Sequence, residues 1–245
     1  MRIRIRFTKK GAVKFVGHLD MMRYFQKAIR RAGLDIRYSE GFSPHQIMSF
    51  ASPLGVGMES EAEYFDIEVN STLSSEESVR LLNAQMAEGI EVRSYIRLPD
   101  EAKNCMSAAA ATDYRILFRP GHGEFPAGDE LSSKISSFLS REEIIAEKEV
   151  KPKNKQKKKR STAPAVKQIN IRPLIYDFTN EGDEMYVKLS SASGRSLNTR
   201  VFLEAFCRYL GYGYGQDDFM ITRLEVYFLS GDALVPLDQA GEEIG

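Results

Sequence analysis

The first residues alternate between arginine and apolar side chains, and this alternation limits the folds that the chain can adopt. Residues 2–7 read RIRIRF, so that Arg2, Arg4 and Arg6 occupy every second position. Because successive side chains of a strand point to opposite faces, the pattern predicts a strand with one apolar face and one arginine face. The fold has to bury the first face and either expose or neutralise the second.

The residues that follow predict alternating helices and strands. Apolar side chains recur at helical spacing from Leu19 to Ala32, and Gly33 follows as a helix stop. We expect further strands over 47–51, 64–69 and 91–98, and a helix over 76–87 capped by Ser74 or Ser75. The order βαββαβ is typical of a ferredoxin-like domain, an antiparallel sheet with both helices on one face and the other face open to a ligand.

A second, looser round of elements predicts a second ferredoxin-like half, so the expected class is α+β. Strands are expected over 112–119, 142–149, 184–190 and 221–229, an extended segment over 168–178, and helices over 129–140 and 201–210. The predicted organisation is a domain over 1–103, a linker over 104–111, a domain over 112–230 and a frayed tail over 231–245. Within the second domain, residues 151–164 are rich in lysine and predict a mobile basic insertion.

Charge is balanced overall but divided unevenly along the chain. The 34 Lys and Arg equal the 34 Asp and Glu, yet residues 1–49 carry eleven cations and three acids, while residues 50–101 carry three cations and eleven acids. No stretch is long and apolar enough for a membrane span, and the first residues have no secretory pattern, so we expect a cytoplasmic protein with no membrane partner. Uneven charge of this kind indicates a polyanion or an oppositely charged partner.

The basic residues form the predicted nucleic-acid surface. The candidates lie in the first strand, the first helix and the lysine run: Arg2, Arg4, Arg6, Lys9, Lys14, Arg23, Lys27, Arg30, Lys157, Lys158, Lys159 and Arg160. For the strand, an alternative stays open, because Asp66 and Glu68 alternate on a neighbouring strand and could pair with the arginines across the sheet. RNA binding and internal pairing are then competing interpretations of the same arginines.

The loop YSEGFSPH is the predicted ligand loop. Tyr38 and Phe42 offer rings, and Glu40, Ser43 and His45 offer polar groups, a composition suited to a base or another ring. A Ser43–His45–Glu40 triad is a weaker interpretation, because side chains this close in sequence rarely point at one another. A purely structural loop is the alternative.

Two further places have a functional and a structural interpretation. His18 and Asp20 lie where the first helix should begin. His18 could act there as an acid, a base or a phosphate donor, or else Asp20 caps the helix and His18 packs. Near the last helix, Gly194 and Arg195 with the first free N–H groups could hold a phosphate. There the alternative is that Ser196 or Asn198 only caps the helix.

Neither a metal nor a cofactor is expected. The three histidines show no metal-binding spacing, and the glycine pairs lack the strand and helix context of a dinucleotide site. Cys105 and Cys207 are the two cysteines and lie far apart in the sequence, so a cysteine-ligated cluster is not expected.

Long strings in the first 70 residues resemble a known family. RIRF at 4–7, HLD at 18–20, YSEGFSPH at 38–45, SFASPLGVG at 49–57 and SEAEYFDIE at 60–68 are similar to the uncharacterised radical-SAM-linked proteins. The resemblance implies a small cytoplasmic bacterial protein fused to, or encoded beside, a radical-SAM protein, and it implies no defined activity. A radical-SAM enzyme holds its iron–sulfur cluster with three closely spaced cysteines, so this chain, with two cysteines, is not expected to be that enzyme itself.

These observations lead to one expectation and two alternatives. We expect a non-enzymatic protein that binds RNA or presents a substrate to a separate radical-SAM enzyme. The first alternative is a metal-independent ribonuclease that uses His18 or His45, and the second is a protein–protein adaptor.

Overall fold

The computed structural model describes residues 1–150 and 165–245, which fall into two compact units. Unit 1 comprises Met1–Arg115, Ser191–Gly194 and Ile221–Gly245, and unit 2 comprises Ile116–Ser190 and Arg195–Met220. Each unit is therefore assembled from separate stretches of chain, whereas the sequence predicts two consecutive domains. The lysine run with Lys157, Lys158, Lys159 and Arg160 lies outside the described residues.

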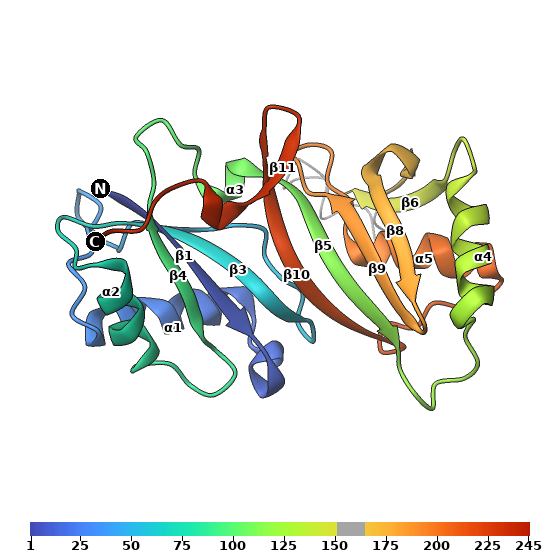
Figure 1. The fold of residues 1–245 in the computed structure, drawn as a ribbon, viewed down its shortest axis with the longest axis horizontal. Helices are drawn as coiled ribbons and strands as arrows, with labels where there is room; N and C mark the ends of the chain where they lie inside the picture. The colour runs from blue at the N-terminus through green and yellow to red at the C-terminus, as the bar shows by residue number, and fades with distance from the viewer. Residues whose placement is uncertain (151–164) are drawn as a thin grey trace. The chain divides into compact units, whose positions relative to one another are not determined.

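The chain is an α+β protein, and its described part holds five α-helices with a nine-stranded mixed sheet and a two-stranded sheet. The order in the large sheet is β4-β1-β3-β10-β5-β9-β8, with β11 paired to β10 and β2 paired to β3 (Figure 1). Two of its strands, β5 (Ala109–Phe118) and β10 (Phe219–Ser230), contribute residues to both units.

Unit 1 contains the elements expected from the first hundred residues. They are β1 (Arg2–Lys9), a 3₁₀ helix (Gly11–Phe15), α1 (His18–Arg31), β2 (Met48–Phe50), β3 (Glu59–Glu68), α2 (Ser75–Asn83) and β4 (Val92–Arg97). Strand β1 pairs antiparallel with β3 and β4, and β2 pairs antiparallel with β3. The far side of β3 also pairs in parallel with β10, through Glu59 and Ser60.

The apolar face of β1 forms the core of unit 1. Ile3, Ile5 and Phe7 are buried against side chains of both α1 and α2. The ring of Phe7 lies 4.5 Å from that of Phe25 in α1 in an edge-to-face arrangement, a favoured geometry for aromatic pairs. The period-two pattern is therefore used as the sequence predicts, with its apolar side turned to the helices.

Unit 2 is held by a second aromatic core. Its own elements are α4 (Gly128–Leu139), β6 (Ile145–Val150), β7 (Ala165–Asn170), a 3₁₀ helix (Arg172–Leu174), β8 (Ile175–Glu181), β9 (Glu184–Ser190) and α5 (Thr199–Leu210). Phe178 of β8 meets Phe202 and Phe206 of α5 at 4.9 and 5.0 Å. Phe138 of α4 closes this cluster, 5.1 Å from Phe206.

The last fifteen residues are ordered, which corrects the prediction of a frayed tail. They form β11 (Ala233–Pro236) and a 3₁₀ helix (Leu237–Gln239), and Leu237 is fully buried. Glu242 pairs with Arg97 at the edge of β4 through backbone bonds of 2.8 and 3.0 Å. In Figure 1 this red segment runs from β11 back to β4.

The predicted linker over 104–111 is also structured. Asn104 caps a short helix, α3 (Cys105–Ala108), by accepting from the Ser107 N–H, and Ala109 already begins β5. Cys105 is completely buried. The run of small residues lets the chain pack closely here rather than span a gap.

Candidate nucleic-acid interface

The arginine face of β1 is covered, so Arg4 is not available to RNA. Its guanidinium is fully buried and pairs with both carboxylate oxygens of Asp66, at 2.8 and 3.0 Å. It also donates to the carbonyls of Leu237 and Lys103. Strand register places Arg4 directly opposite Asp66. Internal pairing is therefore the correct interpretation of this residue, and the sheet face that was expected to be open to a ligand is covered here.

The other two strand arginines also have protein partners. Arg6 pairs with Glu225 at 2.9 Å and with Asp238 at 2.8 Å. Arg2 donates to the backbone carbonyls of Pro99, Asp100 and Ala102. Glu68, the other predicted partner, pairs with Arg37 instead.

A buried polar network extends from this face, and sequence reasoning missed most of it. Tyr64 donates to Glu225 at 2.7 Å, and burial raises the pKa of both groups. Arg223 pairs with Glu63 at 2.9 Å although both side chains are almost fully buried. Each pair joins residues about 160 positions apart, so no local motif could have revealed it.

Lys9, the last residue of β1, and Lys14, in the 3₁₀ helix that follows, are engaged within the protein. Lys9 is buried and donates to the Val16 carbonyl at 2.8 Å, and this burial lowers its pKa. Lys14 pairs with Glu59 at 3.2 Å. Neither lysine therefore offers the fully exposed cation that the sequence predicts.

The exposed face of α1 retains its cations. Arg23, Lys27, Arg30 and Arg31 are all exposed. Arg23 pairs weakly with Asp20, and Arg31 donates to Gln85. Among the described residues, Lys27, Arg30 and Arg31 have no carboxylate partner. The charges of these three side chains are thus not neutralised by carboxylates in the described part of the protein.

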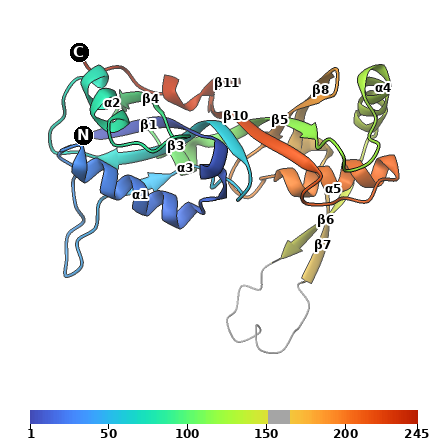
Figure 2. The same ribbon diagram turned by 90° about the horizontal axis from the view of Figure 1, so that it is seen from below.

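The predicted ligand loop is the tip of a small hairpin, residues 37–47. The Ile47 N–H donates to the Arg37 carbonyl at 3.0 Å, and Tyr38 and Gln46 form a bridge. Figure 2 shows this blue loop projecting past α1. The side chain of Gln46 donates to the Gln26 carbonyl of α1 at 3.2 Å and so joins the hairpin to the helix.

The hairpin forms no triad. The His45 ring is hydrogen-bonded through Nδ1 to the Ser39 hydroxyl at 2.9 Å, and the Ser39 N–H donates to the His45 carbonyl. The backbone carbonyl of Ser43 lies 3.4 Å from the same Nδ1 of His45, and Glu40 is exposed. Ser39, which faces His45 across the hairpin, was missed by sequence reasoning, although an antiparallel register would have pointed to it.

His18 packs against an aromatic ring, and Asp20 does not cap the helix. Gly17 is the N-cap of α1, and His18 is its first residue. The His18 ring packs edge-to-face on Phe50 at 5.3 Å. His18 and His45 therefore contact different groups.

The start of α5 is capped by a side chain. The Asn198 side chain accepts from the Val201 N–H at 2.8 Å, which selects Asn198 from the two predicted capping residues. The Ser196 carbonyl accepts from Lys148, and Gly194 takes a left-handed φ of 77°. Gly194, Arg195 and Ser196 are exposed beside the cap.

One His–carboxylate pair lies in unit 2. His122 Nδ1 lies 3.0 Å from an Asp218 oxygen, and the other oxygen of Asp218 accepts from the Gly215 N–H. The pair joins residues 96 positions apart, and sequence reasoning missed it. Arg119 donates to the Asp217 carbonyl beside it, so the contact ties two loops together.

Two observations describe the metal-ligating side chains and the thiols. Within residues 1–150 and 165–245, no group of three His, Cys, Asp or Glu side chains is placed to hold a metal. Both cysteines are buried as free thiols, and burial raises the pKa of Cys105 and that of Cys207, the latter to about 12. No helix in the described part of the chain is long and apolar enough to cross a membrane.

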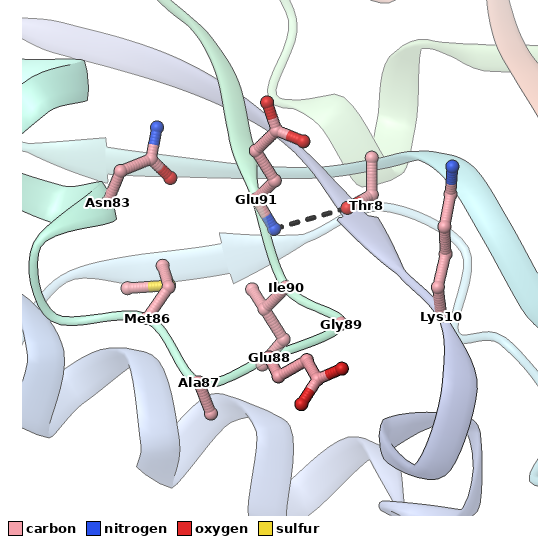
Figure 3. Close-up of a pocket in the computed structure, with 9 residues that line it drawn as sticks. All are labelled: Thr8, Lys10, Asn83, Met86, Ala87, Glu88, Gly89, Ile90 and Glu91. Carbon is pink, nitrogen blue, oxygen red and sulfur yellow. Dashed lines mark hydrogen bonds between the residues drawn. The ribbon is translucent and has the colours of Figure 1, made fainter.

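An open cavity of about 500 Å³ lies in unit 1 beside the turn before β4. The Glu91 N–H donates to the Thr8 hydroxyl across it, and the charged ends of Lys10, Glu88 and Glu91 point in different directions (Figure 3). Gly89 is required here, because a Cβ would lie 2.3 Å from the Lys10 carbonyl oxygen. The cavity brings no reactive groups together.

A larger cavity in unit 2, of about 760 Å³, is acidic. Glu124, Glu130 and Asp183 line it together with the stacked rings of Phe118 and Phe125. Three carboxylates would repel a phosphate backbone. The surface formed by the exposed cations of α1 and by the adjoining hairpin is therefore the best candidate for binding a polyanion.

Comparison with known proteins identifies the family. Residues 2–200 match the family described as "Uncharacterized protein conserved in bacteria (DUF2344)". The chain belongs to this family. None of the curated proteins compared with the chain matches it. The family description assigns no activity, so function has to be argued from the residues themselves.

Proposed function

We propose that this DUF2344 protein is a non-enzymatic RNA-binding protein and that α1, with the adjoining hairpin, is the surface that contacts RNA. The observation that carries the proposal is the set of exposed cations on α1, Lys27, Arg30 and Arg31, which have no carboxylate partner among the described residues. Cations that are not neutralised internally can release counterions from a phosphate backbone, which is the main source of affinity in such complexes.

The position of these cations supports a common surface. Arg23 and Arg30 lie three residues before and four residues after Gln26, so they flank Gln26 on the helix surface, about 10 Å apart along the axis. Gln26 is the residue to which the hairpin is hydrogen-bonded. Segment 18–46 as a whole carries five cations and three carboxylates. An RNA strand that lies along α1 would therefore also pass the hairpin.

The buried network on the other face of β1 supports a structural role for the remaining arginines. We assign Arg2, Arg4 and Arg6 to stability, and we leave them out of the RNA-binding surface. The ribonuclease alternative is less well supported, because the His18 ring is packed on Phe50 and the His45 ring is bonded to Ser39. A metal-independent ribonuclease uses the 2′-hydroxyl of RNA as its nucleophile and needs an acid and a base beside the same phosphate. The contacts of His18 and of His45 bring neither ring beside a second acid–base side chain.

A ferredoxin-like architecture for residues 1–98 is part of the same proposal. The antiparallel order β4-β1-β3-β2, with α1 and α2 sharing one core, supports it. We extend the proposal to an accessory role in the bacterial cytoplasm beside a separate radical-SAM enzyme. The resemblance of the first 70 residues supports that role, as does the presence of only two cysteines in the sequence.

The test is the salt dependence of RNA binding by the full chain. A labelled RNA should bind at low salt, and the logarithm of the affinity should fall with the logarithm of the salt concentration by about 0.7 per phosphate contact. The double variant Lys27→Glu/Arg30→Glu should weaken binding strongly and lower this slope by about 1.4, measured by fluorescence anisotropy.

The matched control is Arg93→Glu, which reverses a cation that is half exposed on β4 and paired with Glu91. It should leave the slope unchanged. The proposal fails if the parent protein does not bind RNA at about 50 mM salt, if binding is insensitive to salt, or if the control weakens binding as much as the double variant.

A further inference from the structure

We infer that the hairpin of residues 37–47 stacks on unpaired bases, so that the preferred ligand of this surface is single-stranded RNA. The inference rests on the proposed function and narrows it to one class of RNA. The cations of α1 would attract any nucleic acid, because the charge of a phosphate backbone is independent of sequence and pairing. Selectivity for single strands has to come from groups that contact bases, and the hairpin carries such groups.

Phe42 is the decisive residue, because its ring is fully exposed at the tip of the hairpin. Most large aromatic side chains of this protein are buried or stacked, as Phe7, Phe25 and Phe65 are in the core of unit 1. A ring held in water forgoes the stabilisation that burial would provide. An aromatic platform that projects from a basic surface is a common means of binding bases, since every base has a π-face.

The hairpin presents this ring on a braced support. Two backbone pairings hold its stem, and the Ser39 hydroxyl is bonded to both the ring and the backbone N–H of His45. Gly41, with a φ of 105°, makes the turn next to Phe42. A braced platform loses little conformational entropy when it stacks, so more of the stacking energy remains as affinity.

A second ring lies on the stem of the same hairpin. Tyr38 is 44% exposed, and its hydroxyl accepts from Gln46, the residue that joins the hairpin to α1. Two rings beside a row of cations could bind an RNA strand whose backbone lies along α1 and whose bases turn towards the hairpin. The bases of a duplex are already stacked on one another, so their faces are closed to both rings.

The experiment compares one RNA strand of about 15 nucleotides, lacking self-complementarity, with the same strand annealed to its complement. Both are titrated with the full chain at low salt. The parent should bind the single strand more tightly than the duplex. Phe42→Ala should weaken binding to the single strand by about 5- to 100-fold and change binding to the duplex by less than about twofold.

Two variants make the result specific to an aromatic ring. Phe42→Trp should retain binding to the single strand, whereas Phe42→Leu, which keeps an apolar side chain, should lose it. Tyr176→Ala removes a ring of unit 2 that is 49% exposed and serves as the matched control, with no effect expected. Because Phe42 is fully exposed, circular dichroism should show the same fold for all variants.

The outcomes separate this inference from the proposed function. If Lys27→Glu/Arg30→Glu weakens both RNAs while Phe42→Ala weakens neither, RNA binding stands and base stacking is rejected. Equal losses on the single strand and the duplex after Phe42→Ala also reject stacking. If the parent binds neither RNA, or if it captures a protein through Phe42 without RNA, the proposed function itself is wrong.

Discussion

At the scale of single residues, burial decides whether a charge can serve a ligand or only the fold. Arg4 and Arg30 are the same residue type in neighbouring elements, yet the first is fully buried on a carboxylate and the second is exposed. A guanidinium that is already bonded to Asp66 and to two carbonyls has no donor geometry left for phosphate. The exposed residue keeps both its charge and its donors.

The ion pair between Arg4 and Asp66 gives a stability prediction. Arg4→Met should lower the free energy of unfolding by about 3–5 kcal/mol, because it leaves a buried carboxylate without its cation. Asp66→Leu should cost a similar amount, and the double variant should cost less than the sum, with a coupling of about 0.5–3 kcal/mol. Urea denaturation measures all three.

The control for this cycle is Arg93→Met, which breaks an exposed pair with Glu91 and should cost less than about 1 kcal/mol. Additive effects of the two core substitutions would show that Arg4 and Asp66 are stabilised independently. In that case the charged face of β1 would not form a coupled network.

At the scale of elements, capping residues determine where helices begin. Asn198 accepts from the Val201 N–H at the start of α5, a helix that supplies much of the aromatic core of unit 2. Asn198→Ala should therefore lower the free energy of unfolding by about 0.5–2 kcal/mol. Ser196→Ala alters the other capping residue predicted from the sequence. It should change the free energy of unfolding by less than about 0.5 kcal/mol. Equal effects of the two variants would argue against a specific cap.

Local patterns predicted these elements well, because they depend on neighbouring residues. The alternation in RIRIRF and the cap at Ser74 reappear as β1 and α2. The partners of the arginines could not be chosen from the sequence, since both Asp66 and Glu68 alternate on β3. Register selected Asp66 for Arg4, and the remote residues Glu225 and Asp238 pair with Arg6.

The candidate site was predicted only in part, because some of its features are local and others depend on tertiary contacts. The exposed cations of α1 follow from helical periodicity, and the aromatic loop follows from its composition. The bond between Gln46 and Gln26, which joins the two, depends on tertiary packing. The burial of Lys9 likewise depends on the fold of the chain around it.

At the scale of the whole molecule, the last residues complete the first unit. Leu237 is fully buried, its carbonyl accepts from Arg4, and Asp238 pairs with Arg6. Ending the chain after Ser230 should therefore lower the free energy of unfolding by several kcal/mol or prevent folding of unit 1, since it removes buried apolar area and leaves charges unpaired.

Leu237→Ala tests the same contact within the full chain and should cost about 2–5 kcal/mol. Thermal melting and urea denaturation follow both changes. Stability within about 0.5 kcal/mol of the parent after truncation would show that the segment only rests on the surface.

The division of unit 1 between the two ends of the chain has a consequence for biosynthesis. Arg4 leaves the ribosome long before Leu237, and at about 5–20 residues per second the interval is roughly ten to fifty seconds. During that time Arg4 lacks the Leu237 carbonyl, and Arg6 lacks both of its carboxylate partners, Glu225 and Asp238. The order of synthesis therefore allows the final ion pairs of Arg6 to form only after Glu225 and Asp238 have been made.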